Sequence, residues 1–164
     1  MGRFDFTDET DEEYKFGDRI DNEVLRDSLE HTSLVSYRYI QLKNTDYHFS
    51  QPCLDNRDIV AYFKFMQILT SYPFNRLREE REREWHLYPT EYKGNLKRLI
   101  KEALNLEKGL RPECVPTFYH FALYTDERQA SREEGIKSPR IYFFFGQDAT
   151  IYPLFYDPYH EINP

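Results

Sequence analysis

The sequence has few of the residues that build disulfide frameworks, metal sites and phosphate-binding loops. Its only cysteines are Cys53 and Cys114, and two isolated thiols form neither a disulfide framework nor a zinc site. The six glycines are scattered, and the HExxH, CxxC and GxSxG motifs are absent. The sequence therefore favours neither a nucleotide-dependent enzyme nor a hydrolase of those types. It predicts no cofactor and no bound metal.

Long apolar runs and targeting patterns are absent as well. No apolar stretch reaches the roughly 18 residues that a membrane span needs. The first ten residues, MGRFDFTDET, lack the basic-then-apolar pattern of a signal peptide. We expect a cytoplasmic protein with reduced thiols and no membrane partner.

Negative charge, by contrast, is plentiful and concentrated at the N-terminus. Residues 1–30 carry eleven acidic and four basic side chains, and their net charge of −7 equals that of the whole chain. Residues 31–164 are therefore neutral overall and do not argue against nucleic-acid binding. We predict an acidic arm at residues 1–30, followed by a single domain at residues 31–164.

Strand patterns occupy both ends of the predicted domain. Runs of β-branched and aromatic residues predict strands at 34–42, 116–125, 140–145 and 150–157. The last two strands have the pattern of a hairpin, and Pro153 indicates an edge strand or a bulge because proline cannot donate to the ladder.

Helix patterns lie between these strands. Apolar residues three and four apart predict helices at 57–72 and within 90–109, and the Arg/Glu-rich stretch 75–85 is typical of a solvent-exposed helix. Asp55 or Asn56 is the expected N-cap of the first helix, and its expected apolar stripe is Ile59, Tyr62, Phe63, Met66 and Leu69. The element order predicts an α+β fold, an antiparallel sheet with helices packed on one face.

Residues that can carry chemistry gather in the strand-rich C-terminal part. Asp157 precedes Pro158 and predicts a turn that sets His160 at the end of the sheet. Strand alternation places His120 outward, beside Arg140 and Tyr142. An exposed cluster of these side chains suits a phosphodiester, because arginine clamps phosphate and histidine or tyrosine moves a proton. The alternatives are packing of the chain end, with Asp157 capping the turn, and scattered polar residues on a solvated sheet face.

A second candidate surface surrounds the single tryptophan. Trp85 and His86 are flanked by basic side chains that include Arg98 and Lys101, and this pattern indicates a nucleic-acid surface. The alternative is that Trp85 anchors the core, since interleaved glutamates would repel phosphate.

The C-terminal hairpin, RIYFFFGQDATIYPLFYD, resembles the last hairpin of the RelE/ParE family of small bacterial toxins. Arg140 matches the arginine that often starts that hairpin, and His160 falls where a C-terminal catalytic side chain can sit. The resemblance implies a sheet with helices on one face, metal-free cleavage of mRNA and an antitoxin-like protein partner.

Two functional hypotheses follow. In the first, the chain is a RelE-like toxin or defence-type ribonuclease: His160 is general acid or base, Arg140 stabilises the phosphorane, His120 and Tyr142 assist, and the acidic arm covers the site until it is displaced. In the second, the chain is a non-enzymatic interaction module that docks a protein partner on its aromatic sheet face or on an open edge near Pro153.

Overall fold

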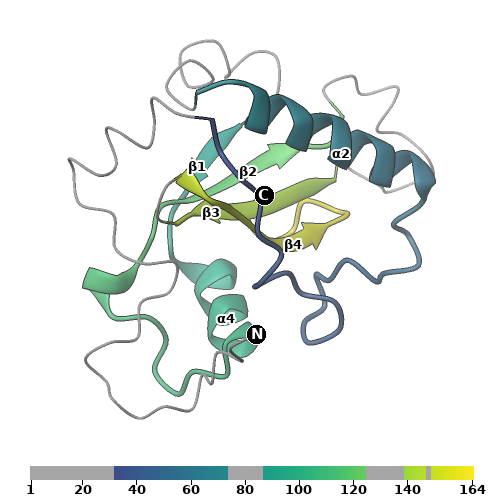
Figure 1. Cartoon of the computed structure of the whole chain (residues 1–164). Coiled ribbons are helices and arrows are strands. Elements are labelled where there is room, and N and C mark those ends of the chain that lie inside the picture. Colours follow the sequence, from purple (N-terminus) through teal and green to yellow (C-terminus); the bar gives the residue numbers. More distant parts are fainter. Residues whose placement is uncertain (1–31, 74–86, 125–138, 147–148) are drawn as a thin grey trace.

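The computed structural model describes residues 32–73, 87–124, 139–146 and 149–164. Along the chain, the elements are α2 (Asn56–Ser71), β1 (Tyr88–Thr90), α4 (Gly94–Ala103), the short 3-10 helix η1 (Pro112–Cys114), β2 (Phe118–Ala122), β3 (Arg140–Phe145) and β4 (Ile151–Asp157) (Figure 1). The predicted acidic arm and the predicted helix at 75–85 lie outside the described residues.

The four strands form one antiparallel sheet in the order β1-β2-β3-β4. The predicted α+β class and antiparallel sheet are therefore confirmed. β4 is one of the two edge strands of the sheet. The register between β3 and β4 shifts between Tyr142 and Phe143, where Pro153 pairs with Phe143. The edge strand and the irregularity expected from Pro153 are thus both present.

The two helices cover opposite faces of the sheet (Figure 1). In β3, Ile141, Phe143 and Phe145 pack in the cluster that contains α2, whereas Tyr142 and Phe144 pack in the cluster that contains α4. The prediction of helices on one face is wrong. The reason is that the run RIYFFF puts apolar side chains on both faces of its strand, and each face needs a cover.

Helix α2 begins with a complete capping box. Asp55 accepts hydrogen bonds from the amides of Arg57 and Asp58, and the Asp58 side chain accepts one from the Asp55 amide. The predicted N-cap is confirmed. The predicted stripe is partly wrong, because Ile59 and Phe63 are exposed while Phe65 packs in the core. The Phe65 ring stacks on Phe121 with 3.5 Å between centroids.

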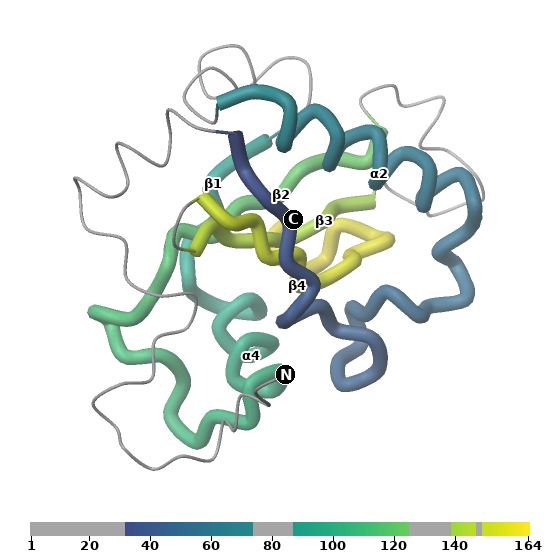
Figure 2. The backbone as a smooth tube through the Cα atoms, in the orientation of Figure 1, coloured from purple at the N-terminus to yellow at the C-terminus, as the bar shows by residue number. Residues whose placement is uncertain are grey.

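The predicted strand at 34–42 is wrong. This segment runs beside the outer edge of β4 (Figure 2) and bonds to it at separated points. The Ile151 amide donates to the Leu34 carbonyl at 2.7 Å, and the Gln41 amide donates to the Leu154 carbonyl at 3.0 Å. A turn at Arg38 and Tyr39 interrupts the pairing. The edge of β4 is therefore covered here rather than open.

Helix α4 is confirmed by its burial pattern, with Leu96, Leu99 and Ile100 inward. Across the described parts of the chain, no helix combines the length and the apolar character that crossing a bilayer requires.

Candidate active site

Five of the predicted site residues meet at one end of the sheet. They are His120, Arg140, Tyr142, Asp157 and His160, which we call the histidine cluster. Strand register sets His120 opposite Tyr142, and Arg140 opposite Asp157. The C-terminal turn brings the His160 ring to within 6.0 Å of the His120 ring, measured between centroids. Three strands and a turn thus assemble residues that are up to 40 positions apart in the sequence.

Asp157 shapes the turn that carries His160. Its carboxylate is fully buried and accepts three backbone hydrogen bonds, from Tyr159 at 3.3 Å, Glu161 at 3.0 Å and Ile162 at 2.8 Å. Burial raises the pKa of Asp157, while the three amides and the charge of His160 oppose that rise. The cap that we gave as the alternative role of Asp157 is present, and its full burial suits a positioning role rather than contact with a substrate.

The backbone of His160 adopts an uncommon conformation. Its φ angle is 57°, in the left-handed region that side chains other than glycine rarely occupy. The turn is held by the two residues that follow His160, because Tyr47 donates to the Glu161 carboxylate at 3.2 Å and Ile162 is buried among core residues on the α4 face. The surrounding contacts therefore maintain a backbone that His160 alone would not prefer.

His120 is buried, with 6% of its surface exposed. Its Nδ1 lies 2.6 Å from Thr90 Oγ1, a hydrogen bond across β1 and β2. Burial, together with the positive charges of Arg140 and His160, lowers the pKa of His120 to about 4, so the ring is neutral at pH 7. The prediction that His120 faces solvent is wrong, because α4 and the C-terminal turn cover this face.

Tyr142 and Arg140 complete the inner part of the cluster. Tyr142 is fully buried, its ring centroid is 5.3 Å from that of His120, and burial followed by the charge of Asp157 raises its pKa. Arg140 is half-buried. Burial lowers the pKa of Arg140, and Tyr142, Asp157 and Tyr88 oppose that change, so the guanidinium keeps its charge.

The cluster has an inner and an outer layer. His120, Tyr142 and Asp157 are buried, whereas His160 and Arg140 are half-buried. Tyr88 stands beside the inner layer with 36% exposure, and its ring is 5.9 Å from His120. An anion that approached from solvent would meet an imidazole and a guanidinium first. Within the described residues, no group of three or more His, Cys, Asp and Glu side chains could hold a metal ion.

The second predicted surface is described only at Arg98 and Lys101. Trp85 and His86 are not among the described residues. Arg98 and Lys101 are exposed on α4, and Arg98 forms an ion pair with Glu102 at 2.7 Å, four residues further along the helix. That pairing reduces the positive charge that α4 presents to a phosphate backbone.

Sequence reasoning missed the contribution of β1. Tyr88 and Thr90, which contact His120, belong to a strand of only three residues. Three residues are too few for a period of two to be recognised. The sequence signal there is limited to the aromatic residue Tyr88 beside Pro89.

No model of a known protein family, no curated protein and no solved structure matches this chain. The resemblance to the RelE/ParE family therefore stays a prediction drawn from element order and the C-terminal hairpin.

Proposed function

We propose that the chain is a RelE-like toxin or defence-type protein, a metal-independent ribonuclease whose site is the histidine cluster. The observation that supports this proposal is the meeting of two histidines and an arginine at one end of the sheet, with His160 and Arg140 reachable from solvent. Imidazole and guanidinium are the groups that phosphodiester cleavage needs when no metal takes part.

Each residue has a stated part in this proposal. Arg140 binds the non-bridging oxygens of the scissile phosphate and stabilises the phosphorane. His160 takes the proton of the ribose 2′-hydroxyl while the 2′-oxygen attacks phosphorus. The resulting imidazolium returns the proton to the leaving 5′-oxygen. The products are a 2′,3′-cyclic phosphate and a free 5′-hydroxyl.

The inner residues act by position in this proposal. His120 is neutral and packs against His160 without adding a second charge, and Thr90 fixes its ring. Tyr142 packs beside His120 on the same face of the sheet, as its partner on the neighbouring strand β3. Asp157 fixes the turn. We expect variants of these residues to disturb the geometry of His160 rather than to remove a reacting group.

The test is cleavage of an end-labelled single-stranded RNA by the full chain, in EDTA at low salt. We expect His160→Ala and Arg140→Ala each to lower the cleavage rate by about a hundredfold or more. The matched controls are His48→Ala and Arg111→Ala, which remove the same side-chain types from a turn near α2 and from the start of η1 and should cut at the wild-type rate.

A lack of cleavage by the wild-type chain would contradict the enzyme proposal. So would cleavage that EDTA abolishes, or cleavage that His160→Ala leaves unchanged. Circular dichroism of each variant confirms that a lost activity is not a lost fold.

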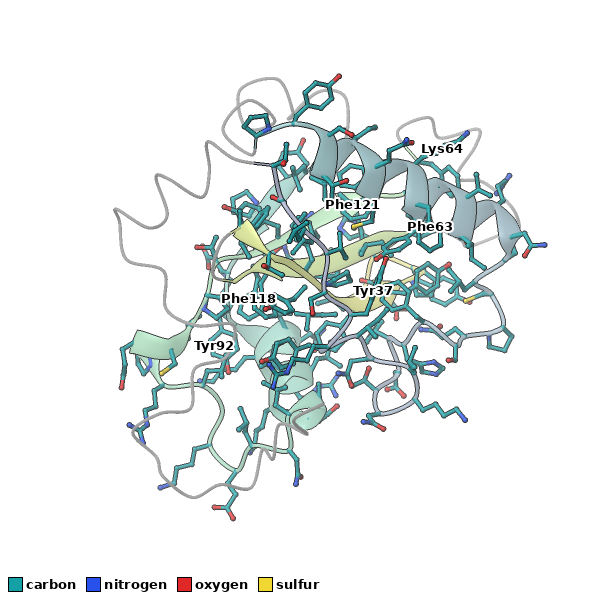
Figure 3. All side chains as sticks on the ribbon, in the orientation of Figure 1. Tyr37, Phe63, Lys64, Tyr92, Phe118 and Phe121 are labelled. Carbon is teal, nitrogen blue, oxygen red and sulfur yellow. The ribbon has the colours of Figure 1, made fainter. Side chains whose placement is uncertain are left out.

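The non-enzymatic interaction module is a second proposal, on a different surface. The sheet faces are buried under α2 and α4 and the β4 edge is covered, so neither surface that we first considered offers a docking site. Exposed rings on and beside α2 favour a partner there instead, with Tyr37 45% and Phe63 55% exposed (Figure 3). Phe63→Ser should then abolish co-purification of a partner, whereas His160→Ala should leave the complex intact.

A further inference from the structure

A groove lies on the α2 side of the sheet, away from the histidine cluster. Its volume is about 700 Å³, and it runs between α2 and the end of β2. The residues of the groove that matter here are Arg57, Val60, Lys64 and Ile68 from α2, and Leu123 and Tyr124 from the segment just after β2. Its wall is mostly apolar, so an occupant needs apolar side chains to fill it.

Two cations stand at this apolar wall. Arg57 and Lys64 are both exposed, and Figure 3 shows Lys64 on the outer side of α2. The Arg57 guanidinium lies 5.2 Å from the centre of the Tyr124 ring, a cation–π contact that holds it at the groove. Nearby Asp58 is buried and accepts hydrogen bonds from Tyr124 and Tyr156. The groove therefore suits an acidic segment that also carries apolar side chains.

The acidic arm has this composition. It carries the full net charge of −7, and aromatic residues interrupt its acids at Phe4, Phe6, Tyr14 and Phe16. A groove with apolar walls and exposed cations is complementary to such a segment in charge and in hydrophobicity.

The chain also leads to the groove. Thr32, the first described residue, bridges to Pro73 just past the end of α2. A helix of 16 residues is about 24 Å long at 1.5 Å per residue. The residues before Thr32 could span that length more than once when extended, at about 3.3 Å per residue. Tethering at the end of α2 raises the effective concentration of the arm at the groove.

We infer that residues 1–30 bind in cis in the groove between α2 and β2, through their acidic and aromatic side chains. This inference does not rest on the proposed ribonuclease activity. In the first hypothesis the arm covers the histidine cluster. The inference places the arm on the opposite face of the sheet instead.

The test is amide hydrogen exchange of the full chain, followed by mass spectrometry of peptides from residues 1–30. We expect these peptides to be protected in the wild-type chain. Arg57→Glu combined with Lys64→Glu should speed their exchange by about tenfold, because the variant repels the acids that the wild type attracts. Lys108→Glu combined with Arg111→Glu makes the same charge change beyond α4 and should have no effect.

Two further variants keep the outcome decisive. Val60→Glu adds a negative charge at an exposed groove position, 52% exposed, and should act in the same direction as the double variant. Arg140→Gln tests the cluster as the binding place. The inference is overturned if residues 1–30 exchange at unprotected rates in the wild type, if only Arg140→Gln speeds their exchange, or if no variant changes it. Unchanged exchange in β3 shows that each variant is folded.

Discussion

On the α2 face, the buried carboxylate of Asp58 accepts hydrogen bonds from two tyrosines that are distant in the sequence, Tyr124 at 2.8 Å and Tyr156 at 3.0 Å. On the α4 face, the buried carboxylate of Asp157 accepts hydrogen bonds from three amides within five residues of itself. Both carboxylates are fully buried. Asp58 fastens α2 to strand β4 and to the segment just after β2, whereas Asp157 shapes one local turn.

The difference between the two carboxylates extends to their surroundings. The turn that Asp157 holds presents His160 beside His120, with a left-handed backbone at His160 and a lowered pKa at His120. Strained backbone and shifted pKa values gather at functional sites more often than elsewhere. We therefore expect the Asp58 network to serve stability, and the turn that Asp157 shapes stays the functional site that we propose.

The largest stability effect is expected from Asp58→Ala. The substitution leaves two buried tyrosine hydroxyls without their acceptor and removes the Asp58 half of the capping box of α2, so the free energy of unfolding should fall by about 3 to 5 kcal/mol. Urea denaturation measures this fall in the free energy of unfolding. A loss below about 1 kcal/mol would mean that the network does not fasten α2 to the sheet.

Asp157→Ala should have a smaller effect on stability, since two of the three freed amides, those of Tyr159 and Glu161, are only partly buried and can reach water. We expect a loss of about 2 to 3 kcal/mol. The ring signals of His160 should also move in the NMR spectrum, whereas Asp58→Ala should leave them in place. Equal effects of both variants on His160 would remove the contrast between the two faces.

A pH dependence should follow from His120. Its pKa of about 4 in the folded chain lies below the unfolded value of about 6.5, so the unfolded state binds more protons between these values and stability falls as pH falls through this window. The free energy of unfolding should drop by about 2 kcal/mol from pH 7 to pH 5. His120→Gln should flatten that slope, and an unchanged slope would show that His120 is not the group responsible.

The smallest effect is expected from Tyr156→Phe. Removing one hydroxyl leaves Asp58 with its bond from Tyr124, so the loss should be about 1 kcal/mol. Urea denaturation of Tyr156→Phe and Asp58→Ala under the same conditions gives the ratio of their losses in the free energy of unfolding. A loss as large as that of Asp58→Ala would show that Tyr156 alone carries the network.

The sequence predicted the bounds of helices and strands best where an apolar or aromatic pattern repeats over many residues. The helix at Asn56–Ser71 and the strands at Arg140–Phe145 and Ile151–Asp157 lie close to their predicted bounds, because caps and alternating aromatic residues mark them. The segment at 34–42 has the composition of a strand, but a turn and the irregular β4 edge prevent continuous pairing. Propensity does not show which partner a strand will find.

Strand alternation predicted which strand residues belong to the histidine cluster, but it did not predict that part of the cluster is buried. Alternation places His120, Arg140 and Tyr142 on one face whatever covers that face. The cover comes from α4 and from Ile162, which depend on tertiary packing. The contact between Thr90 and His120 came from a strand too short to predict.

The most direct test of the account is an NMR titration of the histidine ring signals in the full chain, assigned with His120→Gln and His160→Ala. Adding a nucleoside 3′-phosphate should shift the His160 signals and leave those of His48 in place, while His120 should stay neutral at pH 5.5. A His120 that titrates near pH 6.5 would contradict the buried, neutral inner layer, and a nucleotide that moves no signal of His160 would contradict the proposed phosphate-binding role of the histidine cluster.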